Sequence, residues 1–341
     1  LVEFLLRTGS IDNRFTGFDR ANEGARLHRR LQKEAARLYP DYRAEVPLKE
    51  TLTCAGVTYT LEGRADGIYT RDGVTVIEEI KTTACPSDHI TEDHAPEHWG
   101  QGEVYAAIYA RQNGLDNLRV QLTYYQVEEE LTLRFERDYT AGQLEGILTD
   151  LLTRYAPWAR RAADWRQASR AALEGLGFPF PDYRPGQRAM MTQVYRTCLE
   201  GGALLCQAPT GIGKTMSVLF PALKALGAGV AGPVFYLTAR GTTRAAAEDA
   251  LDRLRRSAPG LPLRSVTLTA KDKICLCESR ECTPEACPYA DGYYARCKDA
   301  LWAALGDETG ALGAEALQRY ARAYTVCPFE LGLDLSLWCD V

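Results

Sequence analysis

The chain has 341 residues, of which 46% are apolar, and a formal net charge of −5. This length favours two or three domains, and the mildly acidic charge excludes a chain-wide attraction to nucleic acid, so any such contact must come from local basic patches. The sequence has no apolar run long enough to span a membrane and no basic leader, which predicts a cytoplasmic protein, and the missing initiator Met indicates a fragment of a longer product.

The first 138 residues alternate between helical and strand patterns. A strand pair joined by the turn residues Asp72 and Gly73 follows the first helix, and a second strand pair follows the second helix. The expected elements are a helix over residues 22–38, strands over 57–61 and 74–77, a helix over 97–112, and strands over 119–127 and 131–135.

Two carboxylates and a lysine are expected together in the first strand pair. Asp66 closes a glycine-flanked turn at residues 63–67, and Glu79 and Lys81 end the next strand. Side chains two residues apart on a strand share a face, so Glu79 and Lys81 project together, Asp66 can join them, and Glu78 points to the opposite face. Two carboxylates suit one or two Mg²⁺ or Mn²⁺ ions, and the lysine can orient an attacking hydroxide, which predicts phosphodiester hydrolysis.

These three residues resemble the acidic-acidic-lysine signature of the PD-(D/E)XK nuclease superfamily. The resemblance extends to its RecB-like branch, because Gln101 and Tyr105 match that branch's Gln-x-x-x-Tyr motif and would face bound DNA from one side of a helix. His28 matches the helix histidine that can complete the branch's metal site, and a neutral imidazole beside carboxylates suits Mn²⁺.

Residues 140–173 favour a helix interrupted at Pro157, followed by an extended linker. Its arginines and the tryptophans Trp158 and Trp165 allow two interpretations: a surface that guides a nucleic-acid strand, or a bridging helix whose tryptophans are docked. Beyond the linker, strand patterns at 203–207, 234–237 and 264–268 alternate with helices, which predicts a parallel α/β sheet.

The segment from Ala208 to Thr215 has the Gly-Lys-Thr ending of a phosphate-binding loop, although Ala208 stands where the general pattern has glycine. Gly211 and Gly213 would turn backbone N–H groups toward the phosphates of ATP. Lys214 would neutralise the β and γ phosphates, and the Thr215 hydroxyl would bind Mg²⁺. Flanking segments resemble two motifs of superfamily 2 helicases. The resemblance implies an adenine contact for Gln187 and DNA-backbone contacts for Thr238 and Arg240.

Eleven cysteines without a signal peptide, seven of them between Cys275 and Cys339, favour metal ligation in a reducing compartment. Their spacing does not match the Cys-x-x-Cys pairs of usual zinc sites. The surrounding segments resemble the iron–sulfur domain of XPD/DinG-like helicases. That resemblance implies a 4Fe-4S cluster held by Cys275, Cys282, Cys287 and Cys327. Cys277 is the main rival of Cys275, and a zinc site or a redox-inert thiol cluster is the alternative to the iron–sulfur cluster.

Together these features predict an α/β chain: an ATP-dependent, XPD/DinG-type DNA helicase coupled to a metal-dependent DNA nuclease, in DNA repair or recombination, that acts on single-stranded or forked DNA. The acidic Walker B box and the second motor domain are missing from the sequence, so we expect weak nucleotide binding. The alternative is a non-catalytic DNA-binding module with a structural zinc or iron–sulfur centre.

The expected domains are a nuclease domain at 1–138, a helical linker at 139–181, the first part of a RecA-like motor domain at 182–270, and a mainly helical iron–sulfur domain at 271–341.

Overall fold

The computed structural model describes residues 1–14, 18–239 and 241–341, and the side chains of residues 18–23 are not described. Contacts divide the chain into two compact units, which are described separately below. The first unit holds residues 1–160 and 281–295, and the second holds 161–280 and 296–341. None of the described helices is both long and apolar enough to cross a membrane.

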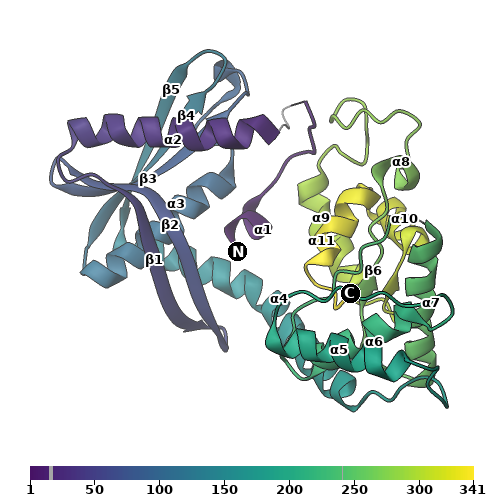
Figure 1. Cartoon of the computed structure of the whole chain (residues 1–341). Helices are drawn as coiled ribbons and strands as arrows, with labels where there is room; N and C mark the ends of the chain where they lie inside the picture. Colours follow the sequence, from purple (N-terminus) through teal and green to yellow (C-terminus); the bar gives the residue numbers. More distant parts are fainter. Residues whose placement is uncertain (15–17, 240) are drawn as a thin grey trace. The chain divides into compact units, whose positions relative to one another are not determined.

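The first unit is built on one mixed five-stranded sheet (Figure 1). In spatial order its strands are β1 (Arg43–Cys54), β2 (Val57–Arg71), β3 (Val74–Thr83), β4 (Asn117–Gln126) and β5 (Leu131–Thr140). Neighbouring strands are antiparallel except β3 and β4, which are parallel. Parallel strands need a crossover connection, and the helix between β3 and β4 provides it.

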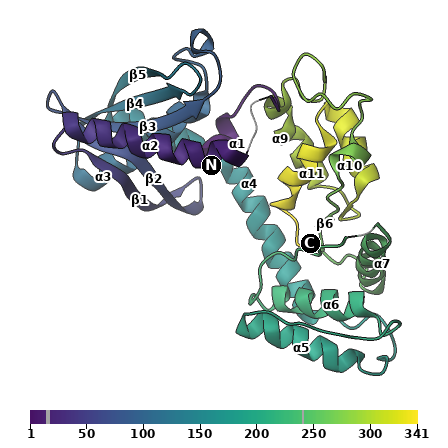
Figure 2. The same ribbon diagram turned by 45° about the horizontal axis from the view of Figure 1, so that its top comes forward.

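Helices cover both faces of this sheet (Figure 2). The helical elements are α1 (Val2–Leu6), α2 (Phe18–Leu38), the short 3-10 turn η1 (Ser87–His89), α3 (Pro96–Asn113) and α4 (Ala141–Gly175), whose last part belongs to the second unit. On one face, Leu27 and Leu31 of α2 pack against Tyr125. The preceding residue, Tyr124, lies in the larger core that α3 and α4 form on the opposite face, as strand alternation requires.

Three local expectations in this unit were wrong. Strand β1 was not expected, and residues 63–67, expected as a turn, lie inside β2. Glycines occur there because tyrosines pack against the strand: a Cβ at Gly63 would lie 2.5 Å from the Tyr105 ring, and one at Gly67 would lie 2.2 Å from the Tyr42 hydroxyl. Helix α4 continues through Pro157, where buried side chains such as Leu152 hold it in place.

The two-residue turn between β2 and β3 was predicted correctly, and Asp72 and Gly73 adopt φ angles of 54° and 77°. The tryptophans of α4 are docked, in agreement with the bridging interpretation. Trp158 packs edge-on against Phe4 at 4.9 Å between ring centroids. In the second unit, the Trp165 indole N–H donates to Asp340 at 3.0 Å.

The second unit is mainly helical. Its elements are α5 (Gln187–Glu200), α6 (Lys214–Gly227), α7 (Gly241–Ser257), β6 (Ser265–Val266), α8 (Lys271–Ile274), α9 (Tyr293–Ala304, which begins in the first unit), β7 (Ala311–Leu312), α10 (Ala314–Tyr324) and α11 (Pro328–Ser336). Strands β6 and β7 pair in parallel, and α6 and α7 share a core that includes Leu219, Leu223 and Leu254.

The parallel sheet expected in this unit is not formed among the described residues. Segments 203–207 and 234–237 have no strand structure, and only Ser265–Val266 of the third expected strand is extended and paired. Leu205 is 99% exposed and Leu237 is 88% exposed. An apolar alternating pattern gives a segment the tendency to form a strand, but neighbouring strands must supply the hydrogen bonds.

Candidate active site

The predicted acidic residues meet in the paired segments of β2 and β3. Gly67 pairs with Glu78, so Asp66 and Glu79 lie at the same level of the sheet. One Asp66 carboxylate oxygen accepts a hydrogen bond from the Ile80 backbone N–H at 2.7 Å, and the other lies 3.6 Å from Nδ1 of His28. Helix α2 thus places His28 beside Asp66.

Glu79 is the most constrained member of the group, because its side chain is only 3% exposed. Oε1 lies 2.7 Å from the Lys81 ammonium, whereas Oε2 is buried and has no hydrogen-bond partner among the described residues. Burial raises the pKa of Glu79 to about 7, with the positive charge of Lys81 opposing the shift and the negative charge of Asp66 adding to it. A buried carboxylate oxygen without a partner is costly unless a cation or proton occupies it.

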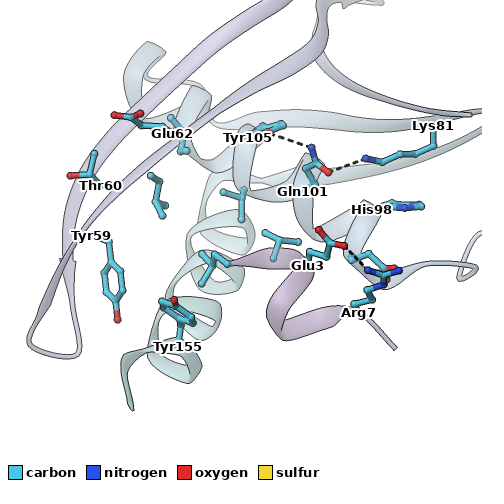
Figure 3. Close-up of a pocket in the computed structure, with 16 residues that line it drawn as sticks. Glu3, Arg7, Tyr59, Thr60, Glu62, Lys81, His98, Gln101, Tyr105 and Tyr155 are labelled. Atoms are coloured by element: carbon cyan, nitrogen blue, oxygen red, sulfur yellow. Dashed lines mark hydrogen bonds and ion pairs between the residues drawn. The ribbon is translucent and has the colours of Figure 1, made fainter. Parts of the chain in front are cut away.

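Lys81 connects this carboxylate to α3. Its ammonium group donates to Gln101 Oε1 at 3.0 Å, and Gln101 Nε2 donates to the Tyr105 hydroxyl at 3.2 Å (Figure 3). The five residues predicted as catalytic are therefore brought together, four of them in one chain of polar contacts from Glu79 to Tyr105. Gly63 allows the close approach of the Tyr105 ring to β2.

Glu78 points to the opposite face of the sheet, as predicted. Its carboxylate accepts hydrogen bonds from the Tyr42 hydroxyl at 2.8 Å, the Gln121 amide at 2.8 Å and the Thr123 hydroxyl at 2.6 Å. These donors satisfy Glu78, so of the two adjacent glutamates it is Glu79 whose buried oxygen has no hydrogen-bond partner among the described residues.

A cavity of about 640 Å³ adjoins Lys81, Gln101 and Tyr105 (Figure 3). Sequence reasoning missed His98 in its wall, although this residue lies three positions before Gln101 on the same helix face. His98 Nδ1 is 2.9 Å from the Tyr124 hydroxyl. Burial and the nearby charge of Lys81 lower the pKa of His98 to about 3, so the imidazole is neutral at physiological pH.

Gln32 was also missed, one helical turn beyond His28. Its amide donates to the Asp66 carbonyl at 3.0 Å and to Glu45 at 2.9 Å, which fixes α2 against β2. A polar residue four positions after a candidate ligand on the buried face of a helix is the signal that could have revealed it.

No group of three or more His, Cys, Asp or Glu side chains within the described ranges is arranged to hold a metal ion. The open oxygen of Glu79 nevertheless fits a hard divalent cation, with Asp66 as the second carboxylate and His28 beside it. Mg²⁺ characteristically keeps several waters and uses one or two carboxylates together with substrate phosphate, so a complete protein chelate is not required.

The segment predicted as a phosphate-binding loop belongs to the second unit, and two of its glycines have positive φ angles. Gly211 and Gly213 have φ angles of 92° and 82°, and α6 begins immediately afterwards at Lys214. Gln187 is buried against this loop, since a Cβ at Gly213 would lie 2.6 Å from its amide nitrogen. Lys214 is exposed and Thr215 is half-buried.

The residues predicted to contact DNA in a helicase motor, Thr238 and Arg240, do not lie in a described helix or strand. Thr238 lies in an irregular exposed segment, and Arg240 falls outside the described residues. Cys282 and Cys287 are buried in the first unit, where the Asn13 N–H donates to the Cys282 carbonyl at 3.0 Å. The remaining predicted ligands, half-buried Cys275 and buried Cys327, belong to the second unit.

The chain is similar to known proteins over segments of very different length. A 46-residue segment is 44% identical to "Probable ATP-dependent helicase MJ0942" of Methanocaldococcus jannaschii, and the match covers 14% of this chain and 7% of that protein. A solved structure, "Crystal structure of SSO0001", matches with 18% identity and a TM-score of 0.29 over 39% of this chain and 59% of that one, too low to bear on the fold. The family model described as "PD-(D/E)XK nuclease superfamily" matches residues 10–291, well over half of the chain. The chain belongs to the PD-(D/E)XK nuclease superfamily.

Proposed function

We propose that this chain cleaves phosphodiester bonds in DNA with the help of Mg²⁺ or Mn²⁺. The observation that carries the proposal is the buried Oε2 of Glu79, which has no hydrogen-bond partner among the described residues. Glu79 lies beside Lys81 and level with Asp66. Asp66, Glu79 and His28 are the proposed metal ligands. When bound, the cation would supply Lewis-acid activation of water and of the phosphate.

Residues around the carboxylates have distinct proposed roles. Glu79 and Gln101 together hold the Lys81 ammonium in a fixed position, from which it stabilises negative charge on the scissile phosphate. Tyr105 orients Gln101 through its hydroxyl. DNA in single-stranded or forked form is the proposed substrate.

Substitution at two positions tests this proposal. Asp66→Ala and Lys81→Ala should each lower the rate of Mn²⁺-dependent cleavage of DNA by about 10²-fold or more, since each removes a group that acts on the reacting phosphate. Lys49→Ala, which changes an exposed lysine on β1, is the matched control and should cleave normally. Unchanged cleavage in both test variants would refute the proposal, and parallel assays of DNA and RNA strands of one sequence identify the substrate.

We also propose that the second unit is the first part of an ATP-driven, XPD/DinG-type helicase motor. Support comes from the left-handed glycines of the phosphate loop, the position of Gln187 against it, and the short similarity to a helicase-named protein. ATP binding, measured by equilibrium titration, should weaken about tenfold or more in Lys214→Ala, since the lysine neutralises phosphate charge. Equal affinity in the variant and the parent chain would contradict this role.

The proposed 4Fe-4S cluster depends on the cysteine motifs and on the burial of Cys282, Cys287 and Cys327. Iron, acid-labile sulfide and zinc content of anaerobically purified protein tests it. Iron and sulfide that disappear in Cys282→Ser or Cys327→Ser, but not in Cys198→Ser, are expected. Zinc without iron would replace the cluster with a zinc site.

A further inference from the structure

Helix α2 carries a stripe of basic side chains that the site described above does not use. Arg26, Arg29, Arg30, Lys33 and Arg37 recur three and four residues apart, and together with Glu34 they line a shallow hollow of about 340 Å³. All of these side chains are exposed. Five cationic side chains and one carboxylate thus line this hollow, in a chain whose net charge is −5.

Among the described residues, Glu34 is the acid that lies within the stripe, fewer than a solvated helix face normally carries. Arg30 forms an i,i+4 ion pair with Glu34 at 3.0 Å, and both side chains remain about half exposed. Arg29, Lys33 and Arg37 have no ion pair with a described residue. The concentrated positive potential therefore stays available for an external polyanion.

The stripe is fixed relative to the proposed cleavage site, because the same helix contributes to both. Leu27 and Leu31 are buried against the sheet, and Gln32 donates to the Asp66 carbonyl at 3.0 Å. Arg29 directly follows His28, whose imidazole lies 3.6 Å from Asp66. An anion on the outer side of α2 would thus be separated from the carboxylates by at least the diameter of this helix, about 10–12 Å.

We propose that this basic stripe binds the phosphate backbone of the DNA strand that is being cleaved, on one side of the scissile bond. From Arg26 to Arg37 the stripe extends about 16 Å along the helix, enough for several consecutive phosphates. This inference rests on the proposed nuclease function. Exposed arginine and lysine side chains bind the negatively charged phosphates of the DNA backbone, so the contact is independent of base sequence.

Salt-dependent binding tests the proposal without any need for catalysis. Binding of a labelled DNA single strand is measured in EDTA between about 50 and 200 mM salt, where each phosphate contact contributes about 0.7 to the slope of log K against log salt concentration. The double variant Arg29→Gln/Lys33→Gln should lower the slope by about 1.4 and weaken binding about tenfold. The matched control Arg111→Gln/Arg134→Gln removes two exposed arginines of the same unit, on α3 and β5, and should bind as the parent chain does.

Cleavage at saturating DNA separates this inference from the nuclease proposal. The stripe variant should retain the parent cleavage rate with Mn²⁺, whereas Glu79→Gln should lose cleavage and keep the parent affinity and salt slope. A stripe variant whose affinity and slope equal those of the parent chain would overturn the stripe proposal alone. A parent chain that binds DNA through the stripe but does not cut it would overturn the nuclease proposal alone.

Discussion

Glu78 and Glu79 are adjacent and chemically identical, yet the sheet gives them opposite environments. Glu78 accepts three side-chain hydrogen bonds on one face. Glu79 faces the other side, where one of its oxygens is open. Strand alternation alone assigns the two side chains to different faces, so this distinction could be predicted from sequence.

The raised pKa of Glu79 predicts a pH-dependent stability for the metal-free protein. The folded-state pKa of about 7 exceeds the ordinary value of 4.5, so the folded protein holds the proton more tightly than the unfolded chain does. The free energy of unfolding should therefore fall as the pH rises from about 4.5 to about 7, and remain lower above that range. The glutamine side chain in Glu79→Gln stays neutral at every pH. The substitution should therefore raise the free energy of unfolding by about 2–3 kcal/mol near pH 8 and have little effect on it near pH 4.5.

Urea unfolding in EDTA at both pH values measures this effect, and Glu78→Gln is the control. That variant disturbs the hydrogen bonds from Tyr42, Gln121 and Thr123 and should destabilise the protein by about 1–3 kcal/mol at either pH. If Glu79→Gln proved less stable than the parent chain near pH 8, the described environment of this carboxyl would be wrong.

Single residues outside a known motif were harder to predict. His98 and Gln32 join the site only because α3 and α2 pack against the sheet at particular angles, which local patterns do not define. The open oxygen of Glu79 depends in the same way on the side chains that surround it. Sequence reasoning identified the residues that match chemistry-bearing motifs, and tertiary packing supplied their partners.

At the scale of secondary structure, Gly63 of β2 allows Tyr105 of α3 to pack closely against the strand. A Cβ at Gly63 would lie 2.5 Å from the Tyr105 ring, so Gly63→Ala must displace Tyr105 and with it the hydrogen bond to Gln101. We expect cleavage to fall about tenfold, because the Lys81 ammonium loses its fixed support. Gly146→Ala on α4, where no atom lies within 4 Å of the added Cβ, should leave the cleavage rate unchanged.

Combining Gly63→Ala with Tyr105→Ala separates displacement of the ring from general damage to the strand. Once the ring is absent, the added methyl group has nothing to displace, so the double variant should cleave no more slowly than Tyr105→Ala alone. Fully additive losses would show that Gly63 acts through the backbone of β2 and not through Tyr105.

Elements were predictable where the local pattern and the tertiary context agree. Helix α3 was expected close to its observed bounds, α2 begins four residues before its expected start, and the turn between β2 and β3 was expected correctly, although both strands are longer than predicted. Segments 203–207 and 234–237 carry a strand pattern but form no strand. The Val234 N–H donates to the Asp340 carbonyl at 2.9 Å, but the described residues form no continuous ladder with these segments. Pro157 is the reverse case, in which packing maintains a helix through a residue that usually breaks one.

At the scale of each unit, Asp340 is a buried anchor of the second. Its carboxylate accepts hydrogen bonds from the Trp165 indole at 3.0 Å, the Ser169 hydroxyl at 3.1 Å and the Arg264 backbone N–H at 2.8 Å. Asp340→Ala would leave two buried donors and the half-buried Trp165 indole without their acceptor, and should lower the free energy of unfolding of this unit by about 3 kcal/mol. Urea unfolding followed by tryptophan fluorescence measures the loss.

Asp334→Ala provides the control for that substitution, because this aspartate is half-buried on α11. Asp334→Ala should lower the free energy of unfolding clearly less than Asp340→Ala does. Equal losses in the two variants would mean that Asp340 does not anchor the unit.

For the molecule as a whole, the nuclease family was predictable from sequence, and the family model confirms it. The division into four domains stays a prediction. Contacts place residues 281–295 with the first unit, where backbone hydrogen bonds join Ile11 to Ala290 and Asn13 to Cys282. Residues far apart in sequence make these bonds, and local patterns carry no information about such pairs.

Cleavage by two neighbouring variants tests the central claim most directly. The parent chain, Glu79→Gln and Glu78→Gln are each incubated with DNA and Mn²⁺, and the rate of phosphodiester cleavage is measured under single-turnover conditions. We expect cleavage by the parent chain, a loss of about 10²-fold or more in Glu79→Gln, and at most a modest reduction in folded Glu78→Gln. Equal rates for the parent chain and Glu79→Gln would contradict the assignment of Glu79 as the carboxylate that serves the metal.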